Sequence, residues 1–178
     1  METGNHSQVR QPAVAGMFYP GNPSELAHEV RALLHATASQ TLRGDAPKAI
    51  VAPHAGYIYS GPTAACVYAC IAPAASRIRR VVLLGPTHRV AVDGLALPAA
   101  THFATPLGDI EIDRDAANLL ADMPQVGVSD LPHRQEHSLE VQLPFLQALL
   151  PQFRLLPLAV GRASAEAVAQ VLERLWGG

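Results

Sequence analysis

Short apolar runs along the chain alternate with longer segments in which hydrophobic residues recur at helical spacing. Strands are predicted at 49–52, 81–84, 94–97, 107–112 and 155–160. Helices are predicted at 24–34, 61–72, 113–121, 138–150 and 164–175, with Ser24 and Ser164 as N-caps. Pro144 lies inside the fourth helix, where it should kink or restart the helix. The alternation predicts an α/β domain with a mainly parallel sheet flanked by helices.

The two ends of the chain and one internal stretch fall outside this rhythm. The first twenty residues are interpreted as an arm, and Thr37 to Pro47 as a polar linker. The last helix stops at Trp176, although a helix in that position normally crosses over to a further parallel strand. We therefore expect residues 1–178 to form a single domain that lacks a strand or is completed by another chain.

Composition narrows the class of protein. Hydrophobic residues make up 49% and charged residues 16% of the chain, which favours a folded, well-packed domain. No apolar run is long enough to span a bilayer, and the start lacks the pattern of a secretory signal, so we expect a cytoplasmic protein without a membrane partner. The net charge of -2 argues against a nucleic-acid partner, which would require a basic surface.

Two segments repeat one pattern, an apolar run followed by a proline and then a histidine. His54 follows Pro53, and His88 follows Pro86 by two residues. Ligands of open α/β sheets bind at the carboxyl ends of the strands, so two neighbouring strands ending here can direct both imidazoles at one metal ion. Either histidine alone is also compatible with a core or loop residue hydrogen-bonded to a backbone carbonyl.

Other residues near these histidines are candidates for the same pocket. Tyr57 and Tyr59 lie between two glycines and can serve as pocket walls or proton donors. His137 and Glu140, three residues apart, would share a face near a helix start. A charged helix start, with Glu136 and Glu140 placed to suit the helix dipole, is the structural alternative.

Several common catalytic motifs are absent from the sequence. It contains no Gly-x-Gly-x-x-Gly loop, no Walker A loop and no Gly-x-Ser-x-Gly elbow. We therefore expect no nucleotide cofactor and no serine-hydrolase chemistry.

Five motifs in register resemble those of the Memo family, whose bacterial and archaeal members are called AmmeMemoRadiSam system protein B. They lie at 14–20, 52–57, 84–88, 105–108 and 136–140. The resemblance implies a fold similar to class III extradiol dioxygenases, with His54 and His88 as metal ligands. It also places His137 in the pocket as a candidate acid–base group, and it implies iron or copper as the metal.

The resemblance further implies that family members continue beyond Gly178 into a strand, a Ser-Ser-Asp-x-x-His segment and a cysteine. The third metal ligand is then expected outside this chain, and an exposed edge is expected to promote self-association. Three functions stay open: a metal-dependent oxidoreductase of dioxygenase type, a non-catalytic protein that binds a small molecule or a peptide in the same crevice, and a metal-dependent hydrolase.

Overall fold

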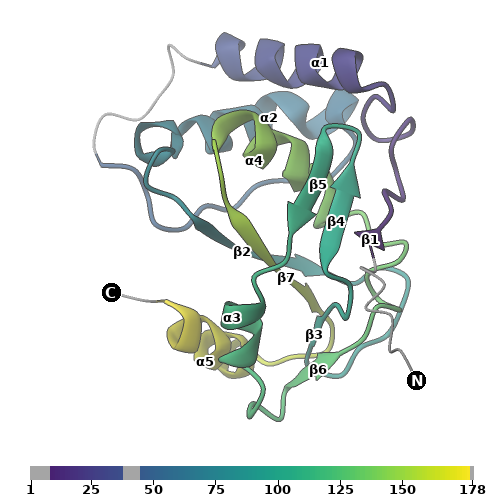
Figure 1. Cartoon of the computed structure of the whole chain (residues 1–178), viewed down its shortest axis with the longest axis vertical. Helices are drawn as coiled ribbons and strands as arrows, with labels where there is room; N and C mark the ends of the chain where they lie inside the picture. Colours follow the sequence, from purple (N-terminus) through teal and green to yellow (C-terminus); the bar gives the residue numbers. More distant parts are fainter. Residues whose placement is uncertain (1–8, 38–44, 177–178) are drawn as a thin grey trace, which may run out of the picture.

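The computed structural model describes residues 9–37 and 45–176 of the chain, and it has an α/β fold built on two sheets (Figure 1). The strands are β1 (Val9–Arg10), β2 (Arg80–Pro86), β3 (Leu95–Leu97), β4 (His102–Thr105), β5 (Gly108–Glu111), β6 (Val126–Val128) and β7 (Arg154–Val160). The helices are α1 (Pro23–Ala36), α2 (Tyr57–Ala69), α3 (Arg114–Asn118), α4 (Leu143–Leu149) and α5 (Ala165–Leu175). Two short 3-10 helices are η2 (Ala72–Ala74) and η3 (Glu140–Gln142).

The larger sheet has four strands in the order β2-β7-β3-β6. β2 and β7 run parallel and pair over their whole lengths, from Arg80 opposite Arg154 to Pro86 opposite Val160. β3 is parallel to β6 but antiparallel to β7. The predicted α/β class is confirmed, and the sheet mixes both strand directions rather than being parallel throughout.

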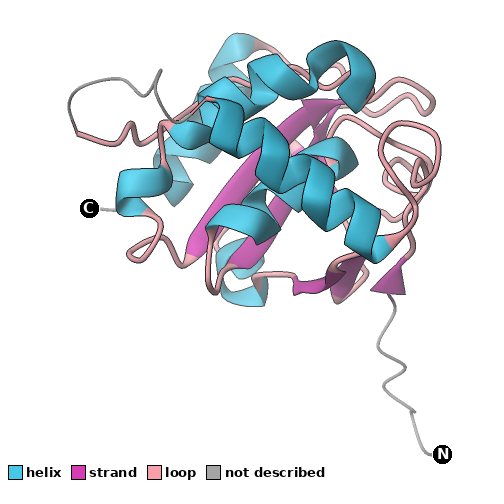
Figure 2. Ribbon diagram, turned by 90° about the horizontal axis from the view of Figure 1, so that it is seen from above, coloured by secondary structure: helices cyan, strands magenta, loops and turns pink. Residues whose placement is uncertain are grey.

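Helices cover both faces of this sheet because its central strands are apolar on both sides. Leu155 of β7 packs in one core with residues from α1, α2 and α4. Leu156 and Leu158 point to the opposite face, into a second core with residues from α3 and α5. Figure 1 shows α1, α2 and α4 together at one end of the view and α3 and α5 at the other, and Figure 2 shows helices lying across the sheet.

The smaller sheet, in the order β1-β4-β5, brings the start of the described chain beside the middle of the sequence. β1 pairs in parallel with β4, so Val9 lies opposite His102 and Arg10 opposite Phe103. β4 and β5 form an antiparallel hairpin. The chain then leads from β1 toward α1 along the side of the molecule where the site described below is found.

Helix boundaries agree with the sequence at several positions. Ser164 caps α5 by accepting a hydrogen bond from the amide of Ala167. The predicted restart at Pro144 is confirmed, because η3 gives way to α4 there and Pro144 occupies its first turn, where no amide donor is needed. The cap of α1 is not Ser24 but Asn22, whose side chain accepts the amides of Ser24 and Glu25.

Two sequence-based expectations in the region before α2 are wrong. Residues 49–52 do not form a strand; Val51 is 92% exposed, while Ile50 and Ala52 pack partly against the core. An extended segment that buries alternate residues cannot be distinguished by composition from a short buried strand. Tyr57 and Tyr59, between the two glycines, belong to the first turn of α2. α2 starts four residues before the predicted helix.

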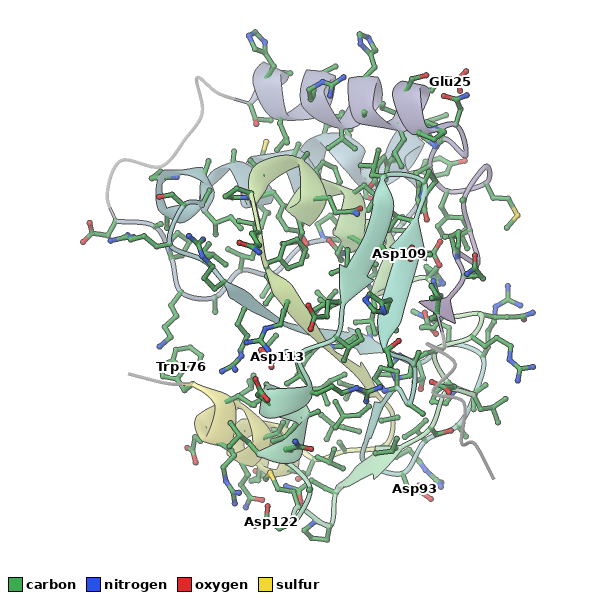
Figure 3. The ribbon with its side chains drawn as sticks, in the orientation of Figure 1. Glu25, Asp93, Asp109, Asp113, Asp122 and Trp176 are labelled. Atoms are coloured by element: carbon green, nitrogen blue, oxygen red, sulfur yellow. The ribbon has the colours of Figure 1, made fainter. Side chains whose placement is uncertain are left out.

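The link between the sheet and α3 depends on Asp113, labelled in Figure 3. Its side chain caps α3 at the Ala116 amide and accepts a hydrogen bond from Arg80 at 2.5 Å. Burial raises the pKa of Asp113, but its hydrogen bonds from Arg80 and the Ala116 amide outweigh this and lower it overall. β2 is thereby tied to the strand-to-helix turn across the sheet.

Among the described residues, no helix combines the length and apolar character needed to cross a membrane. Most of the predicted linker, the first eight residues of the predicted arm, and Gly177 and Gly178 lie outside the described residues.

Candidate metal centre

Three histidines from separate parts of the chain meet at one point. His54, His88 and His137 each offer a ring nitrogen, and these nitrogens lie within 4.8 Å of one another. The rings of His88 and His137 are stacked with their centroids 4.6 Å apart, and His54 lies 5.3 Å from His88 and 5.8 Å from His137. The structure therefore brings His137 into the same cluster as the pair expected from the Pro-His pattern.

His88 reaches this point from the end of β2, as the sequence predicted. Ser138 Oγ donates a hydrogen bond to the carbonyl of Pro86 at 2.9 Å, which joins the end of the strand to the segment carrying His137. The close approach requires a glycine at position 85, because an added Cβ would lie 2.7 Å from Ser138 Oγ and 2.9 Å from a methyl carbon of Leu139. The segments that carry His88 and His137 are thus joined by contacts within the protein alone.

Glu136 hydrogen-bonds to the ring of His88 and lies beside the ring of His137. Its Oε1 lies 2.8 Å from Nδ1 of His88 and 3.3 Å from Nδ1 of His137. The same carboxylate accepts the backbone amides of His88, His137 and Ser138 at 2.6, 2.9 and 2.9 Å. A carboxylate on Nδ1 keeps the proton there and leaves Nε2 free as a ligand atom, as in carboxylate–histidine–metal arrangements.

The electrostatics of the cluster suit a neutral His137 beside an ionised Glu136. Burial raises the pKa of Glu136, but the hydrogen bonds from the Ser138 amide and from His88 outweigh it and hold the pKa at about 2. Burial lowers the pKa of His137, against the opposing effect of Glu136, and the neighbouring His88 and His54 lower it further. Metal ligation requires neutral imidazole, which the lowered pKa of His137 favours.

His54 is placed without the strand that the sequence predicted. Its neighbours on either side are held instead: Gln142 Nε2 donates to the carbonyl of Pro53 at 3.0 Å, and Ser60 Oγ donates to the carbonyl of Ala55 at 2.9 Å. Gln142 is itself buried in η3, a few residues after His137. The segment that carries His137 therefore also helps to position His54.

The donor set fits a first-row transition metal. Nitrogens bound to one ion at about 2.0–2.1 Å lie about 3.3–4.1 Å apart, so small ring rotations bring the three histidines to a common ion. Imidazole ligands suit zinc, copper, iron and nickel, so the residues alone do not select among these metals. Three protein ligands leave at least one coordination position free for water or another small molecule.

A cavity of about 900 Å³ adjoins the cluster. Its lining includes His88 and His137, the residues from Val9 to Val14, Met17 and Phe18, and polar residues from the loops after β2 and before His137. Phe18 also contacts the ring of His137, with centroids 4.9 Å apart. The volume lies within the range of small-molecule sites in proteins, so a ligand in the cavity can contact the histidine cluster.

The other residues expected in the pocket occupy different environments. Tyr57 is buried in the core, and its hydroxyl donates to the carbonyl of Val141 at 2.8 Å. Tyr59 is 83% exposed on α2. Glu140 is fully buried behind the cavity. None of the three lines the cavity or joins the histidine cluster.

Glu140 instead anchors the segment that forms one wall of the cavity. Its carboxylate pairs with Arg10, and it accepts the amides of Ala13 and Val14 at 2.7 and 3.0 Å. The hydroxyl of Tyr19 donates to the same group at 2.6 Å, and burial together with this bond raises the pKa of Tyr19. A buried carboxylate with four donors is well compensated, so Glu140 fixes the wall.

Sequence reasoning missed the role of Glu136, which it assigned to a charged helix start. After His137 the first helical element is η3, which begins only at Glu140, so Glu136 lies before any helix in this segment. The available signal was its place beside His137, because a carboxylate next to a ligand histidine can reach the backbone and a neighbouring ring.

Comparisons with known proteins agree with this architecture. The profile of the family described as Memo-like protein matches residues 10–176. A MEMO1 family protein of Methanosarcina barkeri is 42% identical over 164 residues, covering 92% of this chain and 58% of its own length. Relatives with the same family name from Archaeoglobus fulgidus and Aquifex aeolicus are 36% and 40% identical, covering 94% and 86% of this chain and 60% and 55% of their own lengths.

The chain therefore spans somewhat less than two thirds of the length of these curated relatives. The matched range contains the positions of all three histidines of the cluster and of Glu136. The chain belongs to the Memo-like protein family.

Proposed function

We propose that this chain binds one transition-metal ion through His54, His88 and His137 and presents it to a small molecule in the adjoining cavity for redox chemistry. His137 then acts as the third ligand rather than as a separate acid–base group. The preferred metals are iron and copper, as the family resemblance implies.

The observation that carries the proposal is the convergence of three imidazole nitrogens within 4.8 Å of one another. Core histidines satisfied by backbone carbonyls, the structural alternative, use one ring nitrogen each and have no reason to converge. Here one imidazole, that of His88, is oriented at Nδ1 by the buried carboxylate of Glu136, and the other two rings lie beside it. Such orienting groups raise the basicity of the ligand nitrogen and fix the ring.

A transition-metal ion with an open position supplies Lewis acidity and access to electron transfer. The chain's own residues hold a proton, fix the spacing of the rings and shield one of them. Glu136 holds a proton on Nδ1 of His88, the joined segments at Pro86 and Ser138 fix the spacing of two rings, and Phe18 shields one side of His137. A ligand in the cavity then lies in a space that His88 and His137 help to line.

Metal binding is tested on protein purified without an affinity tag and titrated with zinc, copper(II) and iron(II). We expect the wild type to bind one ion, and His54→Ala and His137→Ala each to bind at least about tenfold more weakly. His35→Ala, an exposed histidine at the end of α1, is the matched control and should bind as the wild type does. Equal binding by wild type and both cluster variants would reject the metal site.

The reaction class needs a second measurement. Oxygen uptake by the iron-reconstituted protein with catechol, above that of His54→Ala treated identically, supports redox chemistry. Metal-dependent ester hydrolysis without oxygen uptake supports the hydrolase alternative. Tight metal and ligand binding with neither reaction supports a binding function for the same cavity.

A further inference from the structure

Two arginines in the cavity have guanidinium groups that no described residue uses. Arg89 and Arg134 both line the cavity and both are exposed. In the part of the chain that is described, neither side chain donates a hydrogen bond or joins an ion pair. Arginine presents planar, paired donors that match carboxylate and phosphate oxygens. These two cavity-lining side chains therefore have donors available to a ligand.

Arg10, the third arginine of the lining, shows the contrast. Its Nε donates to the carbonyl of His133, one terminal nitrogen pairs with Glu140, and the other donates to the carbonyl of Glu136. Arg10 is buried, and each of its three guanidinium nitrogens already has a partner within the protein. Arg10 holds the cavity wall, whereas Arg89 and Arg134 remain available to a ligand.

The positions of the two free arginines connect them to the metal cluster. Arg89 directly follows His88 on the loop after β2, and both residues line the cavity with His137. Arg134 precedes His137 by three residues, in the turn fixed by backbone bonds to Asp130. Both arginines therefore belong to the chain segments that carry His88 and His137, and all four residues line the same cavity.

The charge and shape of the remaining lining define the ligand further. Asp130 is the acidic residue of the lining, and its Oδ1 already accepts the amides of Ala99 and Ala100 at 2.8 and 2.9 Å. One wall is apolar, formed by residues that include Val14, Met17 and Phe18. The cavity of about 900 Å³ exceeds what an inorganic anion fills.

We propose that the cavity binds a small organic anion whose carboxylate or phosphate meets Arg89 and Arg134 while its apolar body lies against Met17 and Phe18. The inference rests on the proposed function, because it names the class of molecule that would approach the metal. Arg89 and Arg134 act as specificity residues: they hold the anion and leave the metal ligands unchanged.

The test uses 3-phenylpropionate, its uncharged amide 3-phenylpropionamide, phenyl phosphate and inorganic phosphate as probes. Each is titrated into metal-free and zinc-loaded protein by calorimetry. The acid should bind the wild type with a Kd below about 1 mM and at least about tenfold more tightly than the amide. Phenyl phosphate binding more tightly than the acid assigns the anion as a phosphate ester, and the reverse order assigns it as a carboxylate.

Arg89→Gln and Arg134→Gln should each weaken binding of the preferred anion by about tenfold, since each removes a charge-assisted contact. Arg31→Gln, an exposed arginine on α1, is the control. Equal affinity for acid and amide, a Kd above about 1 mM for both organic anions, or unchanged affinity in both cavity variants overturns the proposal. Inorganic phosphate binding as tightly as the organic anions overturns the assignment of an apolar body.

Zinc affinity of the same variants separates this inference from the proposed function. Arg89→Gln and Arg134→Gln should bind zinc within about threefold of the wild type, because neither supplies a ligand. A wild type that binds the anion but no metal refutes the metal centre and leaves the anion site standing. Metal binding without preference for the anion refutes only the present inference.

Discussion

Replacing Glu136 by glutamine removes one charge from the centre of the site while keeping the size of the side chain. Glutamine has a single acceptor oxygen, whereas the carboxylate accepts from Nδ1 of His88 and from the amides of His88, His137 and Ser138. Whichever way the amide turns, its NH₂ group faces at least one of these donors. The Nδ1 proton of His88 loses its ionised partner, so the orientation of that ring is no longer fixed.

The magnitude follows from the role of such orienting groups. Their loss typically weakens metal binding by about 10–100-fold, or about 1.4–2.7 kcal/mol. We expect Glu136→Gln to weaken zinc binding by this factor. The free energy of unfolding of the metal-free protein should fall by about 1–3 kcal/mol, because several buried donors lose an acceptor oxygen.

The assay measures the two effects separately. Zinc affinity is obtained by competition with a chromophoric chelator, and stability by urea unfolding in EDTA, with Glu173→Gln on the exposed side of α5 as control. Long-range ¹H–¹⁵N spectra should also show that His88 in Glu136→Gln no longer holds its proton only on Nδ1. Zinc binding within about threefold of the wild type, with an unchanged His88 tautomer, would refute the assigned role of Glu136.

Three further predictions concern other parts of the structure. Gly85→Ala should lower the unfolding free energy by about 1–3 kcal/mol and weaken zinc binding, since the new methyl displaces Ser138. Urea unfolding and zinc titration measure the two effects, and an unchanged zinc affinity would contradict the close approach of Gly85 to Ser138. Burial lowers the pKa of His133 to about 4 from its usual 6.5, so the free energy of unfolding should fall by up to about 3 kcal/mol as the pH falls from 6.5 to 4. The free energy of unfolding of His133→Gln, measured in urea, should depend less on pH in that window, and a pH dependence equal to that of the wild type would contradict the prediction. Val51 and Ile58 are 92% and 84% exposed, so the wild type should self-associate weakly. The double variant Val51→Asp/Ile58→Asp should sediment as a monomer at concentrations where the wild type does not, and identical sedimentation of the two proteins would contradict the prediction.

The fold was largely predictable because its strongest sequence signals are local. β2 and β7 are continuous apolar runs, and Ser164 and Pro144 have fixed effects on helix boundaries. The failure at residues 49–52 is instructive, since Ile50 and Ala52 do pack inward. Whether such a segment pairs with a strand depends on partners elsewhere in the chain, which its own residues do not specify.

The site was predictable in part for the same reason. Proline followed by histidine identified His54 and His88, and their convergence with His137 depends on tertiary contacts. The separation of Glu136 from Glu140 was not accessible, because four residues of spacing indicates a shared helix face. In the structure a turn intervenes, and one carboxylate orients the imidazole of His88 while the other binds Arg10.

The most direct test of the metal centre is a long-range ¹H–¹⁵N NMR spectrum of the imidazoles before and after addition of one equivalent of zinc. We predict that Nε2 of His88, Nε2 of His137 and one ring nitrogen of His54 shift to metal-bound values while Nδ1 of His88 stays protonated. The described histidines outside the cluster, which should not change, are His28, His35, His102 and His133. Zinc-dependent shifts at those histidines, or at fewer than three members of the cluster, would contradict a three-histidine site oriented by Glu136.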